Sequence, residues 1–379
     1  MWKRSRRSAH EETLDNGTDD SFVRRTGRYV HVSVSAIATK AAFLFLVGLA
    51  WIFVAQPLFE EAKNPAMRSA LTGHTRVVNA VSFSPDGRMV ASASSDKTVA
   101  IWDTATSRFR RAVLWHGTPI LCVGFSPDGL LLACGVDDGT VMLWNTTTWE
   151  PRPQLTGHCG PVKAVKFAPD GRTLASCGFD GTIRIWEAET GLERSVMSGD
   201  GLPLNSLEWA PDGQTMAVAG VGRTIHLWDI ARRKERVALQ SVDAPIIAAL
   251  SFSTDGGSLA SAGFGGDAIT VWDVDGRRER TRLRAHHGWC HISSIAFSPD
   301  GRLLASAGVD GNVRLWDVVS ETTLAVLRGH RGMVTSVTFS PDGQLLASAG
   351  NDETVRTWEV AAAIEGNLKP LSSAAGFSH

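Results

Sequence analysis

Histidine, serine and aspartate recur in this chain in the combination that a hydrolase uses as base, nucleophile and orienting acid. The three clearest sets are His74, Ser92 and Asp96; His158, Ser176 and Asp180; and His330, Ser348 and Asp352. A hydrolase needs one nucleophile, whereas these sets repeat at the same spacing. We therefore expect them to form structural hydrogen bonds, and we predict that the protein is not an enzyme.

A second group of residues with chemical potential lies in the loop AHHGWCH. His286, His287, Cys290 and His291 are ligand types for transition metals. A single loop rarely imposes tetrahedral geometry, and one of these histidines is expected to serve the repeat. Metal binding and a hydrogen-bonded loop both stay open, the loop is favoured, and no cofactor is predicted.

Tryptophan marks the elements that must position these side chains. It recurs, with spacings of 42 or 44 residues, at Trp102, Trp144, Trp186, Trp228, Trp272, Trp316 and Trp358. A turn such as SPDG precedes each one, in which Pro fixes φ and Gly tolerates positive φ. Alternating runs such as VNAVSF and MVASAS surround the turns. The pattern predicts an all-β, seven-bladed β-propeller of four-stranded antiparallel blades.

The repeat resembles the WD-repeat family. Four consecutive units end in Trp102-Asp103, Trp144-Asn145, Trp186-Glu187 and Trp228-Asp229. Gly-His pairs open units at Gly73-His74, Gly157-His158 and Gly329-His330. The resemblance covers roughly residues 66–363 and implies a ring of four-stranded sheets with a scaffold role. Together with the N-terminal segment described below, it suggests a membrane-anchored, bacterial-type member.

The resemblance also implies a buried hydrogen-bond chain of His, Ser, Asp and Trp within each unit. The residues in these positions are His74, Ser92, Asp96, Trp102, His116, Asp138, Trp144, His158, Ser176, Asp180, Trp186, Ser306, Asp310, Trp316, His330, Ser348, Asp352 and Trp358. The fourth unit has lost all but Trp228, and the fifth has lost its His and Asp. We expect these two blades to be the least tightly braced, with no orphaned polar group in the fourth.

The N-terminal sixty residues differ from the repeat. We assign residues 1–40 to a disordered cytoplasmic tail, 41–59 to a transmembrane helix, 60–65 to a linker, 66–363 to the propeller and 364–379 to a C-terminal tail. The stretch 41–59 has no charge and is long enough to span a bilayer. A cleaved signal peptide and an unusual soluble segment are the alternatives. Because Lys and Arg are denser before it, we expect a single-pass membrane protein with a cytoplasmic N-terminus and an extracytoplasmic propeller.

Composition limits the partners. Lys plus Arg number 38 and Asp plus Glu number 39, so the net charge of −1 argues against nucleic acid. The five cysteines are scattered, and we expect no disulfide. The predicted partners are therefore one or more proteins of unknown identity, together with the membrane through residues 41–59.

The residue before each Asp position is apolar in units 3 to 6. These residues are Phe179, Val221, Phe264 and Val309, and Trp289 lies in the loop beside them. We interpret this group as a candidate partner-binding surface, although the same side chains could simply cover the weakly braced blades. The leading function is a non-catalytic, membrane-tethered scaffold for protein–protein interaction, and the alternative is a ligand- or glycan-binding sensor that uses the axial channel.

We expect the first and last segments of the propeller to pair with each other. Residues 66–71 resemble the segments before the other Gly-His pairs, so we expect them to pair as the outermost strand of the blade built from residues 331–360.

Overall fold

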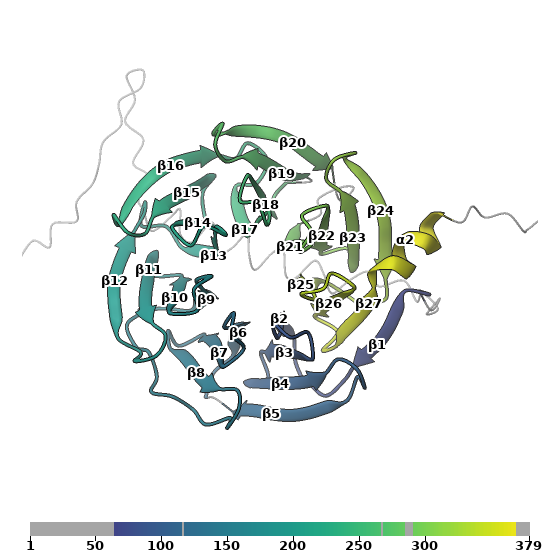
Figure 1. Cartoon of the computed structure of the whole chain (residues 1–379), viewed down its shortest axis with the longest axis horizontal. Helices are drawn as coiled ribbons and strands as arrows, with labels where there is room; N and C mark the ends of the chain where they lie inside the picture. The colour runs from purple at the N-terminus through teal and green to yellow at the C-terminus, as the bar shows by residue number, and fades with distance from the viewer. Residues whose placement is uncertain (1–63, 116, 267, 285–290, 369–379) are drawn as a thin grey trace, which may run out of the picture. The chain divides into compact units, whose positions relative to one another are not determined.

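The computed structural model describes residues 64–115, 117–266, 268–284 and 291–368. All of these residues belong to one compact unit of the chain. In this part of the chain seven antiparallel sheets surround one axis (Figure 1). The prediction of an all-β, seven-bladed propeller is confirmed.

Each blade begins at the axis, and we number the blades 1 to 7 from β2. The innermost strands are β2 (Val78–Phe83), β6 (Ile120–Phe125), β9 (Val162–Phe167), β13 (Leu204–Trp209), β17 (Ile246–Phe252), β21 (Ile292–Phe297) and β25 (Val334–Phe339). The second strands are β3 (Met89–Ser94), β7 (Leu131–Val136), β10 (Thr173–Gly178), β14 (Thr215–Gly220), β18 (Ser258–Phe264), β22 (Leu303–Gly308) and β26 (Leu345–Gly350).

The remaining strands form the outer half of the ring. The third strands are β4 (Thr98–Asp103), β8 (Val141–Asn145), β11 (Thr182–Glu187), β15 (Thr224–Asp229), β19 (Ala268–Asp273), β23 (Asn312–Asp317) and β27 (Val355–Glu359). The outermost strands are β5 (Phe109–Trp115), β12 (Glu193–Ser198), β16 (Lys234–Gln240), β20 (Arg278–Arg284), β24 (Thr322–Arg328) and β1 (Met67–Leu71).

The SPDG turns reverse the chain between the first and second strands. In blade 1 the backbone N–H of Met89 donates to Ser84 Oγ at 2.9 Å, and that of Arg88 donates to Asp86 Oδ1 at 3.0 Å. Gly87 has φ of 70°, a conformation that favours glycine. All these turns lie at one end of the ring, which we call the turn face. The opposite end, with the turns between second and third strands, is the b–c face.

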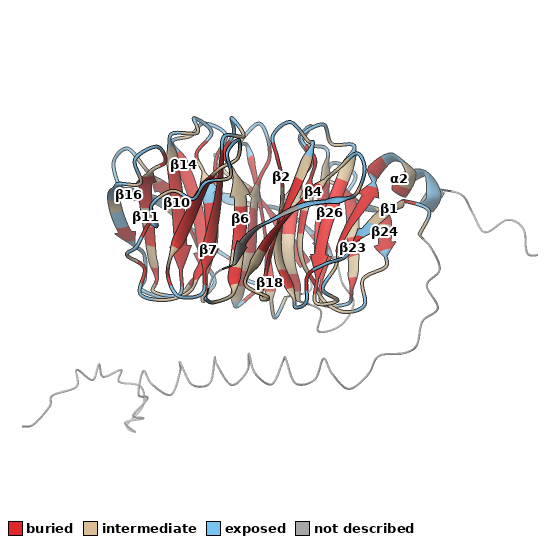
Figure 2. Cartoon of the chain, turned by 90° about the horizontal axis from the view of Figure 1, so that it is seen from below, coloured by how far each residue is buried: buried red, intermediate tan, exposed pale blue. Residues whose placement is uncertain are grey.

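The core lies between neighbouring blades. Second strands are buried along almost their whole length, and in Figure 2 they lie between the exposed turns of the two faces. Trp102, Trp144 and Trp358 are among the largest fully buried side chains. Each blade therefore needs its neighbours on both sides to bury its apolar surface.

Closure of the ring joins the two ends of the propeller. β1 pairs antiparallel with β27, from Met67 opposite Trp358 to Leu71 opposite Val355. This pairing confirms the expected closing strand. A helix that the sequence analysis does not predict, α2 (Val360–Leu368), follows β27 directly and packs against β24, with Val360 and Ala363 buried.

Blade 2 departs from the expected four strands. Its sheet has three, and the fourth segment contributes only isolated bridges, between Val141 and Leu155 and between Trp144 and Pro151. The sequence there is PRPQL, and proline cannot donate to a ladder. Pro151 and Pro153 therefore explain the broken outer strand.

The predicted single-pass membrane localisation, with an extracytoplasmic propeller, is corrected by the structure. Within the described ranges, no helix is long and apolar enough to cross a membrane. The helix α2 has nine residues, which rise about 14 Å against a hydrocarbon core of about 30 Å. Residues 41–59, on which the prediction depended, lie outside the described residues.

Deleting residues 66–71 should destabilise the ring far more than deleting residues 371–379. The first deletion removes the closing ladder and the buried Leu71, and loss of one buried leucine alone costs about 2–5 kcal/mol. Thermal melting of the two deletion variants beside the full chain measures the difference. Equal melting temperatures for the two variants would show that the seam does not depend on β1.

Candidate functional site

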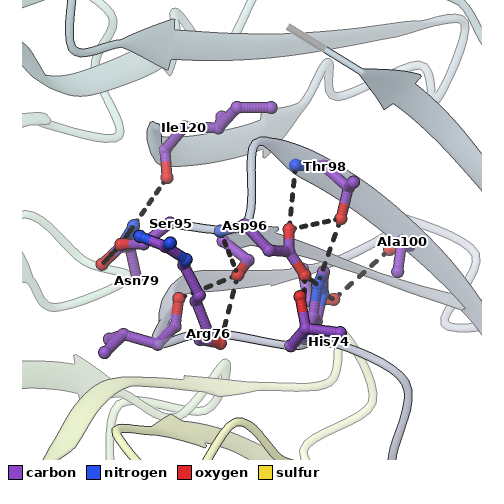
Figure 3. A network of polar contacts seen from close by, with 12 residues as sticks. His74, Arg76, Asn79, Ser95, Asp96, Thr98, Ala100 and Ile120 are labelled. Atoms are coloured by element: carbon purple, nitrogen blue, oxygen red, sulfur yellow. Dashed lines mark hydrogen bonds and ion pairs between the residues drawn. The ribbon is translucent and has the colours of Figure 1, made fainter. Parts of the chain in front are cut away.

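Blade 1 shows how the recurring His, Ser, Asp and Trp are arranged. Trp102 Nε1 donates to Ser92 Oγ at 2.8 Å, and Ser92 Oγ lies 2.7 Å from His74 Nε2. His74 Nδ1 lies 2.8 Å from Asp96 Oδ2 (Figure 3). The Asp accepts from Nδ1–H, so Nε2 is the acceptor for the serine hydroxyl. This chain links the third strand to the loop that enters the blade.

The same chain recurs in blades 3 and 7. His158 contacts Ser176 at 2.8 Å and Asp180 at 2.9 Å, and Trp186 donates to Ser176 at 2.8 Å. In blade 7 the corresponding distances are 2.7 Å from His330 to Ser348, 2.9 Å from His330 to Asp352 and 2.9 Å from Trp358 to Ser348. The three serines have no exposed surface. A substrate cannot reach such a hydroxyl, so the geometry serves bracing and not acyl transfer.

A threonine that the sequence analysis missed completes each chain. Thr98, Thr182 and Thr354 donate their hydroxyls to Asp96, Asp180 and Asp352 at 2.6, 2.9 and 2.8 Å. Each stands two residues after its Asp, and that spacing is visible in the repeat (DKT, DGT, DET).

Hydrogen bonding keeps these aspartates ionised. Burial alone would raise the pKa of Asp96, but bonds from Thr98, from the backbone of Thr75 and from His74 hold it below its usual value. The pKa of Asp352 is likewise held well below its usual range against the effect of burial. The carboxylates are therefore firm acceptors rather than titrating acids near neutral pH.

The other blades keep parts of the chain. In blade 6 Trp316 donates to Ser306 at 3.0 Å, and Asp310 pairs with Arg314 at 2.7 Å. In blade 2 Asp138 accepts from the backbone N–H of Thr140 at 3.0 Å, and Trp144 shares a core cluster with Cys134, while His116 lies outside the described residues. In blade 5 Trp272 donates to Ser261 at 2.8 Å without a histidine.

Blade 4 contradicts the expectation that no polar group is orphaned there. Val218 occupies the serine position, and among the residues that the structure describes the buried Nε1 of Trp228 has no hydrogen-bond partner. Another histidine, which the sequence analysis missed, braces this blade: His226 Nδ1 lies 2.9 Å from Glu235 Oε1, and its Nε2 lies 3.7 Å from Asp200 Oδ2. Blades 3, 6 and 7 carry Arg184, Arg314 and Arg356 at that position. A comparison of this position between the blades could have identified His226 from the sequence.

The candidate metal loop is only partly described. His286, His287 and Cys290 lie outside the described residues, while His291 Nδ1 accepts from the backbone N–H of Gly265 at 2.9 Å. His291 therefore links blades 5 and 6 by a hydrogen bond. Where the chain is described, no group of three or more His, Cys, Asp or Glu side chains could hold a metal ion.

The described cysteines are free. Cys122, Cys134 and Cys177 are buried, and Cys159 is exposed. Burial raises the pKa of the Cys122 thiol to about 12 and also raises the pKa of Cys134 and Cys177. These three thiols are core residues and not nucleophiles.

The predicted partner-binding residues lie at the b–c face. Phe179 is 44% exposed, whereas Val221, Phe264 and Val309 are partly buried. The ring of Phe264 packs on His291, with centroids 5.2 Å apart. Trp289 lies outside the described residues. Phe179 is thus available on the surface and Val221 is available in part, whereas Phe264 contributes mainly to the junction of blades 5 and 6.

Two further apolar side chains extend this surface. Leu202 is 40% exposed and Val242 is 58% exposed, both in loops that enter blades 4 and 5. The side chain of Leu202 lies over Gly222, whose added Cβ would be 3.3 Å from Leu202 Cδ1. Arg223 Nη1 donates to the carbonyl of Val242 at 2.6 Å, which holds this loop beside the same turn.

We call Phe179, Leu202, Val221 and Val242 the apolar arc. Loops lack a hydrophobic period, so Leu202 and Val242 gave no regular signal in the sequence.

Comparison with known proteins agrees with this geometry. The family model for the WD domain, G-beta repeat, matches residues 66–103, 110–145, 149–187, 193–229, 277–317 and 321–359, together more than half of the chain. It does not match the segment between 229 and 277, where the structure nevertheless forms β16 of blade 4 and the three inner strands of blade 5.

Short stretches also match curated proteins. The chain is 65% identical over 37 residues to Protein Mut11 of Chlamydomonas reinhardtii and 40% identical over 52 residues to Ribosome assembly protein 4 of Saccharomyces cerevisiae. It is 57% identical over 37 residues to the probable cytosolic iron-sulfur protein assembly protein Ciao1 of Culex quinquefasciatus. These matches cover 10%, 14% and 10% of this chain and 10%, 10% and 11% of those proteins. The chain therefore spans about a tenth of the length of these relatives.

Substitutions at the serine position should change the free energy of unfolding by different amounts in blades 4 and 5. Ser261→Val would orphan Trp272 Nε1 and should lower the free energy of unfolding by about 1–3 kcal/mol. Val218→Ser gives Trp228 an acceptor, so the new hydrogen bond should offset most of the lost apolar burial and leave a change below about 1 kcal/mol. Chemical denaturation of both variants tests this, and equal losses would contradict it.

The stability of blade 3 should fall on acidification. Burial lowers the pKa of His158 below its usual value, and Asp180 only partly opposes that effect. Below about pH 6.5 the unfolded chain therefore takes up a proton that folded His158 resists, so the stability present above that pH is progressively lost. The pKa of Asp180 is also lowered, so its contribution persists to lower pH.

The measurement compares urea denaturation of the wild type and His158→Asn between about pH 7 and pH 5. The variant should lose less stability over this range, whatever its stability at neutral pH. Parallel pH profiles would show that His158 does not titrate in this way.

Proposed function

The chain belongs to the WD-repeat family, and from that premise we propose that it is a non-catalytic scaffold whose protein partner binds the apolar arc of the b–c face. Propellers of this family generally act as scaffolds rather than catalysts, and they typically bind proteins. Two of the relatives are named as assembly proteins, one for ribosomes and one for iron-sulfur proteins. Those names support a role in bringing proteins together.

The observation that carries the proposal is the exposure of Phe179, Leu202 and Val242 on adjoining loops of three consecutive blades. The carbonyls of Gly201 and Leu202 lie 2.9 and 3.0 Å from where a Cβ on Gly181 would be, so this loop sits against the turn of blade 3. The backbone N–H of Gly222 donates to the carbonyl of Pro245 at 3.0 Å, which joins blades 4 and 5 at the same level. Grouped apolar side chains on one face are typical of a binding surface.

A second candidate, ligand binding in the axial channel, has one observation in its favour. The inner strands line a cavity of about 510 Å³, within the usual size of ligand pockets. However, four serines of its wall are used to join blades. Backbone N–H groups of Val81, Leu250, Phe297 and Val337 donate to Ser336, Ser206, Ser251 and Ser294 at 3.1 to 3.3 Å. We therefore favour the apolar arc.

The test compares two faces of the same ring. Phe179→Ala/Leu202→Ala/Val242→Ala, the arc variant, truncates the three exposed side chains of the arc, and Leu130→Ala/Leu192→Ala/Val319→Ala truncates exposed apolar side chains of the turn face as a matched control. Tagged full-length chains are cross-linked in the cells that produce them, and recovered proteins are quantified. Proteins retained by the wild type and the control should be lost from the arc variant, with little change in its melting temperature.

Recovery of the same proteins by the arc variant would refute the proposal. A sharp fall in the melting temperature of the arc variant would instead show that these side chains belong to the core.

A further inference from the structure

One inner-strand position joins neighbouring blades. Asn79 donates to the carbonyl of Ile120 at 2.7 Å, and Asn205 donates to that of Ile247 at 3.3 Å. Ser293 and Thr335 donate in the same way to Val334 and Val78. These bonds lie near the end of the channel that opens at the b–c face.

Blade 3 carries Lys163 at this position. Its ammonium lies 5.4 Å from the centroid of the Phe179 ring, and the residue lines the axial cavity. Within the part of the chain that the structure describes, no carboxylate makes an ion pair with it, whereas Lys166, three residues further along β9, pairs with Glu208 at 2.7 Å. Lys163 is therefore a cation at the mouth of the channel without a counter-charge of its own.

The surroundings make an added counter-charge favourable. Lys163 is partly buried, and burial lowers its pKa. Asp137 of blade 2 attracts the Lys163 ammonium electrostatically without forming an ion pair with it. A charge that is desolvated without a partner is costly, and an opposite charge gains more there than in water. A second cation would instead be repelled.

Phe179 connects this cation with the apolar arc. Its ring lies against the ammonium and is 44% exposed, and the Gly181 turn two residues further along packs against the carbonyls of Gly201 and Leu202. A peptide segment that covers Phe179 with an apolar side chain would bring its neighbouring side chain to Lys163. We propose that the partner segment bound by the apolar arc carries an aspartate or glutamate next to its apolar residues, and that this carboxylate pairs with Lys163.

This inference rests on the proposed function and goes further by naming the chemistry of the partner. An acidic-apolar peptide is complementary to the site in both respects: apolar side chains cover the arc, and one carboxylate neutralises the cation. Recognition by one buried charge pair within an apolar surface also gives specificity, since an amide in place of the carboxylate leaves the ammonium uncompensated.

The experiment selects a displayed library of random peptides, about twelve residues long, on the purified full chain. Enriched peptides should carry Asp or Glu beside Leu, Phe or similar residues. Lys163→Glu should reverse the preference toward Lys or Arg, and Lys234→Glu, an exposed charge reversal on β16, should leave it unchanged. Thermal melting confirms that each variant is folded.

Affinity measurements then test the pair directly. Lys163→Met should weaken binding of a selected acidic peptide by at least about tenfold. Replacing the acidic residue of the peptide by its amide should weaken binding to the wild type similarly and should have little further effect on Lys163→Met. Independent, additive losses would overturn the proposal.

The outcomes separate this inference from the proposed function. If the arc variant selects nothing while Lys163→Glu still enriches acidic peptides, the arc binds the partner and the pairing with Lys163 is wrong. If the arc variant selects the same peptides as the wild type, the proposed function itself fails. If succinate raises the melting temperature through Lys163 while selected peptides show no acidic preference, the site takes free small anions and the peptide proposal is overturned.

Discussion

The rest of the structure depends on the pairing of β1 with β27. Each blade buries its apolar surface only against the next, so an open seam would leave two faces of the ring exposed. The closing strand prevents this on both sides. Leu71 packs with Val78 and Trp102 of blade 1, and Ala66 packs with Leu315 and Ala325 of blade 6. Residues 66–71 therefore complete the cores at both junctions of blade 7.

The hydrogen-bond chains act within this closed ring as braces for the loops that enter the blades. Blades 1, 3 and 7 hold the entering loop through the histidine, whereas blades 4 and 5 have aspartate at that position. Leu202 and Val242 are in the entering loops of those two blades. Among the described residues, the two entering loops that carry aspartate in place of the histidine are thus those that present large exposed apolar side chains, and they coincide with the proposed binding surface.

The regular part of the molecule could be predicted from the sequence because it repeats. Trp272 and the turn ending at Gly256 identify blade 5, whose three inner strands the family model does not match, and the similarity of residues 66–71 to other entering segments identifies the closing strand. The irregular part could not be predicted in this way. Whether Trp228 Nε1 is hydrogen-bonded depends on the presence of one acceptor next to one buried atom, and the repeat does not specify this. The helix α2 occurs once, so no comparison between blades predicts it.

In the candidate site, too, residues at repeated positions could be predicted from the sequence and residues in irregular loops could not. Phe179 stands in a repeated column and was found by comparing blades, whereas Leu202 and Val242 lie in loops of unequal length where the columns no longer align. The sequence shows that blade 3 has a lysine, Lys163, at this inner-strand position. Its proposed role depends on the absence of an ion pair within the described residues, and only the three-dimensional structure shows which side chains lie near it.

The closing strand also has a consequence for biosynthesis. Ser69 and Thr357, whose hydroxyls meet at 2.7 Å, are 288 residues apart in the chain. At about 5–20 residues per second, a ribosome needs roughly 15–60 s between making the strand and making its partner. Through that interval β1 has no native strand to pair with, and its edge can pair with another nascent chain. The native fold therefore offers the closing strand no partner until the last blade has been made.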